Sequence, residues 1–484
     1  MTETRSYNAH VGGRWEGSGT LLDVHDPSDW DTVVARVPAL GADVVREGYK
    51  TAREGARIWG RTNALERGRV LFRAAAILRD RASELARLLA QENGKTLAEA
   101  TGEVGKSAEF FEFYAGVARL PYGDLIHDAR PDTTTSVWHE PVGVVLAITP
   151  WNDPLLTPSR KLAPAFAAGN AVVLKPASDT PTIALELTRA LVDAGLPPEA
   201  ITTVTGRIGE IGEDLVGSPE IDAITFTGST GVGLDLQRKV AGRNIRVQCE
   251  MGGKNAAIVL ADADLDLAAE TIAAAGFAQA GQRCTATSRV LVEASVKDSF
   301  VERLVAVANS YAAGPSLDPS TVVGPMVSRR QQSDVIGHVA TASAEGATIA
   351  AGGTVGAGEV LQKGCYVLPT VLDDVTADMT IWRTEVFGPV VAVLAVSSLD
   401  EAVELANASE YGLSAALFTK SMSAANTFLR DIDAGQAAVN LPTSGWDVHH
   451  PFGGFKLSGS PFKEQGLGAL AFYTRTKTCA VRAL

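Results

Sequence analysis

The sequence predicts an α/β protein built from doubly wound, mostly parallel sheets. Short apolar runs bounded by turn residues alternate with amphipathic helical stretches, which is typical of strands buried on both faces and covered by helices. The alternation occurs twice, before and after the pair Gly252-Gly253, which indicates two α/β units. The length of 484 residues also exceeds that of one small domain.

The N-terminal part lacks this alternation. The first 60 residues mix short apolar runs with turn signals. From Glu66 to about Gln91, apolar residues recur at spacings of three and four, which predicts a helix that stops at Asn93-Gly94. A second helix is expected from about Leu97 to Arg119. Thr133 to Glu140 alternates without Gly or Pro, as a β-ribbon does.

The first α/β unit is expected after Pro141. Its strands and helices are short and follow one another closely. The expected strands are Val142 to Ile148, Ala171 to Lys175, Ile201 to Val204, Asp222 to Phe226 and Ile245 to Cys249. The expected helices are Lys161 to Ala168, about Pro181 to Ala194, and one from Gly231.

The second unit is expected after Gly253. Its predicted strands are Ala256 to Leu260, Arg289 to Val292 and Val390 to Ala395. Its predicted helices are Leu265 to Gln279, Lys297 to Ala312 and Gln331 to Ala344. The tail, Phe472 to Val481, again has the pattern of a strand.

Charge and cysteine content exclude several classes of function. A net charge of −13, without a local basic cluster, argues against nucleic acid or an anionic membrane as partner. No uncharged apolar run reaches membrane-spanning length, and Met1 to His10 lacks the apolar core of a signal peptide. The four cysteines form no CxxC pair and the histidines complete no zinc site, so no metal is expected and a cytoplasmic location is predicted.

Two turns after predicted strands carry candidate binding groups. In Phe226 to Gly233 a glycine-rich turn opens a helix, which suits a phosphate, although such turns are often purely structural. Asn152 follows a strand end, and its amide can donate to a developing oxyanion. An ordinary turn asparagine is the commoner interpretation of this pattern.

Cys284 and Glu250 are candidate reactive groups. Cys284 lies in Gly281-Gln282-Arg283-Cys284-Thr285, and a thiol becomes a nucleophile as thiolate, beside a positive charge or a base. A lone cysteine is more often structural. Glu250 ends an apolar strand, where burial raises a carboxyl pKa and suits it to general-base work; the alternative is an ion pair with Lys254.

Together these pieces resemble the aldehyde dehydrogenase superfamily over nearly the whole chain. The resemblance rests on seven blocks in the family's order. They are Pro150-Trp151-Asn152, Lys175-Pro176-Ala177, Phe226-Thr227-Gly228-Ser229, Glu250-Met251-Gly252-Gly253-Lys254, Gly281-Gln282-Arg283-Cys284, Glu385-Val386-Phe387-Gly388-Pro389 and Pro451-Phe452-Gly453-Gly454.

The resemblance implies an aldehyde-dehydrogenase-like fold, with two doubly wound α/β domains and a small β-ribbon for oligomerisation. The dinucleotide-binding domain is expected at 1–121 and 142–252, and the catalytic domain at 253–450. The oligomerisation element is expected at 122–141 and 465–484. Because a two-stranded ribbon is not stable alone in water, a homodimer or homotetramer is expected.

The resemblance also implies the chemistry. Cys284 attacks the aldehyde, Asn152 holds the oxyanion, hydride leaves for a nicotinamide, and Glu250 activates the water that hydrolyses the thioester. The implied cofactor-binding residues are Thr149, Trp151, Lys175, Ser178, Gly228, Ser229, Met251, Glu385 and Phe387. Many NAD-preferring members carry an acidic residue where this chain has Ser178, so we expect NADP to be accepted, and even preferred, alongside NAD.

The C-terminal stretches Val448 to Gly454 and Ser460 to Gly466 resemble the branch that acts on 2-oxoglutaric or succinic semialdehyde. Candidates for the substrate carboxylate are Arg160, Arg283, His449 and His450, whereas Trp446 and Phe113 suit an aromatic aldehyde, so an aromatic or aliphatic aldehyde stays open. Asp153 departs from the family, which commonly has an aromatic residue there. Two alternatives from other classes remain. One is an acylating enzyme that passes the acyl group to coenzyme A, but Glu250 argues against it because it supplies the base for hydrolysis. The other is a catalytically inactive binding or structural member.

Overall fold

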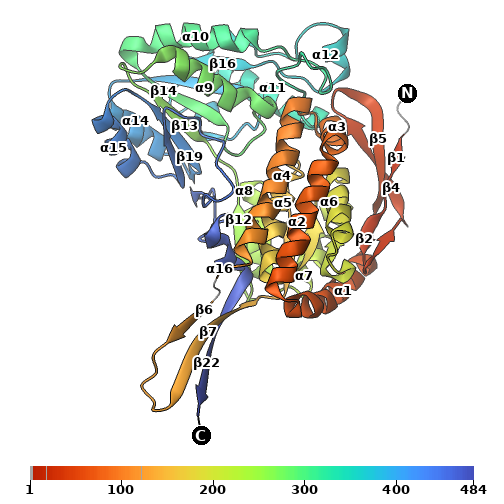
Figure 1. The fold of residues 1–484 in the computed structure, drawn as a ribbon. Helices are drawn as coiled ribbons and strands as arrows, with labels where there is room; N and C mark the ends of the chain where they lie inside the picture. Colours follow the sequence, from red (N-terminus) through yellow and green to blue (C-terminus); the bar gives the residue numbers. More distant parts are fainter. Residues whose placement is uncertain (1–3, 18, 121–122, 484) are drawn as a thin grey trace.

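The computed structural model describes residues 4–17, 19–120 and 123–483 (Figure 1). Residues 121 and 122, where the first expected domain segment meets the expected ribbon, lie outside the described residues, as do 1–3, 18 and 484. Within the described ranges the strands form two seven-stranded sheets and smaller ones. This mixed α/β architecture confirms the predicted fold class.

The first seven-stranded sheet has the order β12-β11-β8-β9-β10-β2-β3 in the described part of the chain. Strands β12 to β10 of this order are parallel, and β2 and β3 extend the edge in antiparallel fashion. Its strands are β2 Ala9–Val11, β3 Arg14–Glu16, β8 Val144–Ile148, β9 Ala171–Lys175, β10 Ile201–Thr203, β11 Ala223–Thr227 and β12 Arg246–Glu250.

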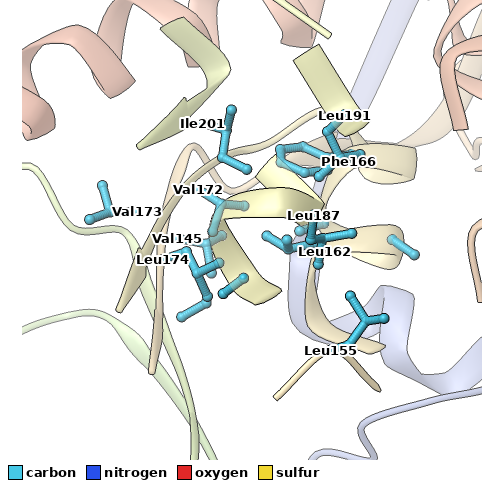
Figure 2. Close-up of a cluster of buried hydrophobic side chains, with 14 of the residues drawn as sticks. Val145, Leu155, Leu162, Phe166, Val172, Val173, Leu174, Leu187, Leu191 and Ile201 are labelled. Carbon is cyan, nitrogen blue, oxygen red and sulfur yellow. The ribbon is translucent and has the colours of Figure 1, made fainter. Parts of the chain in front are cut away.

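Helices on this sheet bury apolar side chains against it. Figure 2 shows part of this core, where Val145 of β8 and Val172 of β9 lie near Leu162, Phe166 and Leu187. The helices are α1 Ala42–Arg61, α2 Ala64–Asp80, α3 Ala82–Asn93, α4 Leu97–Val117, α5 Leu156–Ala168, α6 Thr182–Asp193, α7 Ile208–Gly217 and α8 Thr230–Val240. None of the described helices is long and apolar enough to cross a membrane.

The second seven-stranded sheet, again counted over the described residues, has the order β15-β16-β17-β14-β13-β19-β20. Its strands are β13 Asn255–Val259, β14 Thr287–Glu293, β15 Thr348–Ala351, β16 Thr370–Asp373, β17 Val390–Val396, β19 Ser414–Phe418 and β20 Gln436–Val439. The accompanying helices are α9 Leu265–Phe277, α10 Lys297–Ser310, α11 Arg329–Ala344, α12 Glu359–Lys363, α13 Thr380–Arg383, α14 Leu399–Asn407 and α15 Met422–Asp431. A separate hydrophobic core fills this unit.

A three-stranded ribbon projects from the body of the molecule (Figure 1). It has the order β22-β7-β6, with β6 Gly123–Ile126, β7 Thr133–Pro141 and β22 Thr474–Arg482. The antiparallel register runs from the pair Thr474–Pro141 to the pair Arg482–Thr133. The remaining elements are β1 Arg5–Ser6, β4 Thr20–Asp26, β5 Asp29–Ala39, β18 Tyr411–Gly412, β21 Phe455–Lys456 and α16 Leu470–Tyr473.

Helices α1, α2, α3 and α5 differ clearly from the sequence-based expectation. The single helix expected from Glu66 to Gln91 is two helices, because the backbone of Arg81 leaves the helical region between α2 and α3. Helix α1 lies among residues expected as short runs and turns. Its buried positions include Val45, Tyr49, Ala52 and Trp59, at helical spacing, but interior glycines weaken its pattern. Helix α5 begins five residues before its expected start, a point taken up with the site.

Candidate active site

A cavity of about 420 Å³ lies where loops from both sheets meet. The first sheet supplies Asn152 after β8, Gly228 after β11 and Glu250 at the end of β12. The second half supplies Cys284 from the loop before β14. Because the carboxyl ends of parallel strands share one edge of a sheet, residues far apart in sequence meet in this cavity.

Most residues predicted from the sequence line this cavity. They are Trp151, Asn152, Gly228, Ser229, Glu250, Met251, Cys284, Glu385 and Phe387. Thr149, Lys175 and Ser178 do not line it: the Thr149 N–H donates to the Lys175 carbonyl at 3.1 Å, and the Ser178 hydroxyl donates to the Gly206 carbonyl at 3.0 Å. Of the candidates for substrate recognition, Arg160, Arg283 and Trp446 line the cavity, whereas His449, His450 and Phe113 do not.

The loop that carries Cys284 has an uncommon backbone. Gln279, Ala280 and Gly281 have φ angles of 53°, 54° and 68°, a left-handed conformation that is costly for residues other than glycine. Contacts from other elements hold it: Glu99 accepts the Gln279 N–H at 2.7 Å, and the side-chain amide of Asn255 donates to the Cys284 carbonyl at 2.8 Å. Tertiary packing, not local preference, therefore fixes the position of the thiol.

Burial raises the pKa of the Cys284 thiol to about 12. The Arg160 guanidinium opposes this shift, whereas the carboxylates of Asp153, Glu385 and Glu250 add to it. The thiol is consequently protonated at neutral pH, and Arg160 is the cation that favours its thiolate.

Glu250 is a buried carboxyl group whose two oxygens have no hydrogen-bond partner within the described ranges. Burial raises its pKa well above the ordinary value, the nearby charge of Glu464 raises it further, and Lys161 and Arg160 oppose the rise. The alternative ion pair with Lys254 is not present among the described residues. A desolvated carboxyl group without partners is suited to accept a proton from a ligand or a water in the cavity.

Asp153 lies in a cationic wall of the cavity. Its Oδ1 is 3.2 Å from the Lys95 Nζ and accepts a hydrogen bond from the Gln279 side chain at 3.1 Å. Burial tends to raise the pKa of Asp153, but the charges of Lys95, Arg283 and Arg160 outweigh it and hold the pKa below the usual range. Asp153 is therefore a carboxylate that offsets part of the positive charge of this wall.

Helix α5 supplies Arg160 to this wall. The Arg160 guanidinium is 3.2 Å from the buried Glu464 carboxylate and lies 4.5 Å from the centre of the Phe452 ring. Lys161 pairs with the same carboxylate. Sequence reasoning missed Lys161 and Lys95, because neither residue is part of a local sequence pattern.

The turn after β11 fits a phosphate group. Helix α8 begins there, and its N-cap residue Ser229 makes no side-chain capping bond, so the N–H groups of its first turn are available. Gly233 allows close packing of this helix, since a Cβ there would lie 2.5 Å from the Met251 sulfur. Across the cavity, Trp151 and Phe387 pack edge to face with ring centres 5.3 Å apart.

Near Lys175 the surroundings are less cationic than the sequence suggested. Burial lowers the pKa of Lys175 to about 8, and the opposing charge comes from Asp179. The Lys175 ammonium donates to the Pro176 carbonyl at 2.6 Å. We expected NADP to be accepted because Ser178 replaces an acidic residue. Asp179 directly follows Ser178, however, so a carboxylate is still present at the next position.

Comparisons with known proteins agree with this geometry. A family model described as "Aldehyde dehydrogenase family" matches residues 15–479. The chain is 41% identical to an α-ketoglutarate semialdehyde dehydrogenase of Haloferax volcanii, over 97% of this chain and 98% of that protein. It is 39% identical to a 2,5-dioxopentanoate dehydrogenase of Saccharolobus solfataricus, over 98% and 99%. A crystal structure of betaine aldehyde dehydrogenase from Staphylococcus aureus with NAD+ matches with a TM-score of 0.96 and 32% identity, covering 99% of this chain and 95% of that chain.

Proposed function

The chain belongs to the aldehyde dehydrogenase family, and we propose that it oxidises a small semialdehyde of the 2-oxoglutaric or succinic type to the acid. The observation that carries this proposal is the single cavity lined by Cys284, Asn152, Glu250 and Arg160. A nucleophile, an oxyanion donor and a base are the groups that the oxidation needs, and Arg160 adds a cation for a substrate carboxylate.

The proposed reaction divides one difficult oxidation into two easier stages. The Cys284 thiol releases its proton to solvent, with Arg160 stabilising the thiolate, and the sulfur then bonds to the aldehyde carbon. The Asn152 amide and the Cys284 N–H hold the resulting oxyanion. Loss of hydride leaves a thioester on Cys284. Glu250 then takes a proton from the water that attacks this thioester, which releases the acid and restores the thiol.

A nicotinamide dinucleotide, when bound, supplies the hydride acceptor. The uncapped N-terminus of α8 at Ser229 suits its phosphates, and the similar betaine aldehyde dehydrogenase of Staphylococcus aureus was solved in complex with NAD+. We propose that NADP is accepted as well, because Ser178 does not repel a 2′-phosphate and the Lys175 ammonium can pair with that phosphate. Asp179 weighs against an outright NADP preference.

The substrate proposal rests on charge and on the relatives. Arg160 and Arg283 line the cavity, and the similar enzymes of Haloferax volcanii and Saccharolobus solfataricus are named for aldehydes that carry a carboxylate. Asp153 offsets part of this positive charge, so it limits how strongly an anionic substrate is held. Trp446 and Phe452 also line the cavity and support an aromatic aldehyde as the alternative substrate.

The ribbon supports assembly into a homo-oligomer, dimer or tetramer. Leu125, Trp138 and Val481 on its strands are 78%, 53% and 69% exposed, which is unusual for large apolar side chains on a slender element. A second copy of the chain would cover them. The four cysteines are all free, which supports the reducing cytoplasm as location.

The test is steady-state kinetics across about ten aldehydes with both cofactors. We expect the highest kcat/KM for a carboxylate-bearing semialdehyde, and Arg160→Met should lower it for that substrate more than for benzaldehyde. A preference for benzaldehyde would contradict the semialdehyde proposal. An acyl-CoA product would point to an acylating enzyme, and no NAD(P)H formation with any aldehyde would point to an inactive member.

A further inference from the structure

A buried network lies behind the cavity wall, on residues 93–103, the segment from the end of α3 into α4. Lys95 is 2% exposed and its Nζ donates to the Asn152 backbone carbonyl at 2.9 Å. The same ammonium pairs with Glu103, which is 4% exposed, and with Asp153. Lys95 does not line the cavity, so it does not touch a ligand there.

Glu103 extends this network to the start of α5. Its Oε1 accepts the backbone N–H groups of Leu155 and Leu156, each at 2.9 Å. This carboxylate therefore caps the N-terminus of α5, which explains why the helix begins earlier than the sequence pattern suggested. One Lys–Glu pair thus holds both ends of the turn from Asn152 to Leu156.

Neighbouring residues of the same segment hold adjacent parts of the site. The Asn93 side chain donates to the Trp151 carbonyl at 2.7 Å. Glu99 accepts the N–H of Gln279, in the loop that leads to Cys284, at 2.7 Å. The segment therefore contacts the backbone on both sides of the reacting centre.

Building on the proposed function, we propose that Lys95 is a positioning residue that holds the Asn152 backbone so that its side-chain amide supports the oxyanion. A backbone carbonyl bonded to a buried ammonium cannot rotate away without leaving itself and one buried N–H donor unsatisfied. Small displacements of a catalytic group cost up to about a hundredfold in rate. Lys95 thus acts on the reaction through Asn152.

A double-mutant cycle tests this inference. Lys95→Met should lower kcat and kcat/KM together by about 10- to 100-fold, because the oxyanion develops after substrate binds. In an Asn152→Ala background, Lys95→Met should lower kcat by less than about threefold, since the group through which it acts is absent. The alkylation rate of Cys284 by iodoacetamide should stay unchanged in both backgrounds.

Two further variants serve as the control and as the conservative substitution in this test. Lys297→Met is the matched control, because Lys297 also pairs with two carboxylates, Asp373 and Asp374, but these partners do not line the cavity, whereas Asn152 and Asp153 do. Its kcat should match the wild type. Lys95→Gln retains N–H donors for the Asn152 carbonyl and should lose less activity than Lys95→Met. If the Lys95→Met protein does not fold, Lys95→Gln takes its place in the double-mutant cycle.

The outcomes separate this inference from the proposed function. If Lys95 variants lose the same factor with and without the Asn152 side chain, Lys95 does not act through Asn152 and the inference is overturned. Unchanged kcat in Lys95→Met overturns it as well. If Asn152→Ala itself retains full turnover, the proposed role of Asn152 fails, and the positioning role fails with it.

Discussion

The two halves of the cavity are built in different ways. On the first sheet, Asn152, Gly228 and Glu250 lie at or just after the ends of β8, β11 and β12. On the other side, Cys284 lies on a loop with three successive left-handed residues, 279–281. The first half takes its geometry from regular strands, whereas the second depends on contacts from distant segments. A strand end positions a side chain without an unfavourable backbone conformation. A loop of left-handed residues needs contacts from other segments to offset its conformational free-energy cost.

The largest expected effect tests whether the two halves perform separate chemical steps. Glu250→Gln should lower steady-state turnover by about 10²- to 10⁴-fold, because it removes the base for thioester hydrolysis. Alkylation of Cys284 by iodoacetamide should persist, and the thioester should accumulate with a single burst of NAD(P)H. Mass spectrometry of the acyl-enzyme checks this, and loss of alkylation would mean that the two groups are not separable.

Backbone substitution tests the strained half directly. At Gly281, φ is +68° and an added Cβ would lie 2.1 Å from the Gly388 carbonyl oxygen, so Gly281→Ala must displace the Cys284 loop. We expect about a hundredfold loss of kcat/KM, together with a lower Tm. Gly231→Ala, in the first turn of α8 with no atom near its Cβ, is the structural control and should keep Tm within a few degrees. If Gly281→Ala and Gly231→Ala lowered the Tm equally, the Cys284 loop would be no more sensitive to backbone substitution than the turn after β11.

A third prediction concerns the effect of the Arg160 charge, from the first half of the cavity, on ionisation of the Cys284 thiol in the second half. Because the Cys284 pKa is raised to about 12, its thiolate fraction should rise about tenfold per pH unit below that value, and alkylation should follow without a plateau between pH 7 and 9. Arg160→Met removes the cation that favours the thiolate and should slow alkylation at every pH in this range. Stopped-assay mass spectrometry measures both rates. A plateau near neutral pH would show that the thiol ionises more easily than this burial allows.

The smallest effect is expected at Lys175. Its pKa is lowered to about 8, so the ammonium is present below that pH and is lost as pH rises through it. Attraction for a 2′-phosphate should be lost in the same window, and the ratio of the KM for NADP to the KM for NAD should rise several-fold from pH 7 to 9. Lys175→Met should abolish this pH dependence. A flat ratio in the wild type would exclude Lys175 from 2′-phosphate binding.

The contrast between the halves also explains what the sequence predicts well. The expected strand Ala171 to Lys175 matches β9, because a fully buried strand requires a continuous apolar run. Helix α1 escaped notice because Gly48 and Gly55 interrupt its pattern; an added Cβ at Gly55 would lie 2.1 Å from the backbone of Glu199. That close approach joins segments over a hundred residues apart and has no local signal.

The site shows the same limit. Glycine-rich turns and short motifs point to residues that line the cavity, such as Gly228 and Cys284. Lys95 and Glu103 lack such a signal, because each is one charged residue in a region rich in charges and its partner is set by tertiary folding. The left-handed loop is equally hidden, since Gln279 and Ala280 have no preference for positive φ.

The outer strand of the ribbon has a practical consequence. In the order β22-β7-β6, strand β6 has one neighbour among the described residues, β7, so the backbone amides and carbonyls of Gly123–Ile126 that do not bond to β7 face outward beside the exposed Leu125. An uncovered, apolar strand edge is a template for adding foreign strands. In the proposed homo-oligomer, a protomer released by dilution would therefore tend to form insoluble aggregates before it could reassociate, and purified enzyme should keep its activity longest in concentrated stocks.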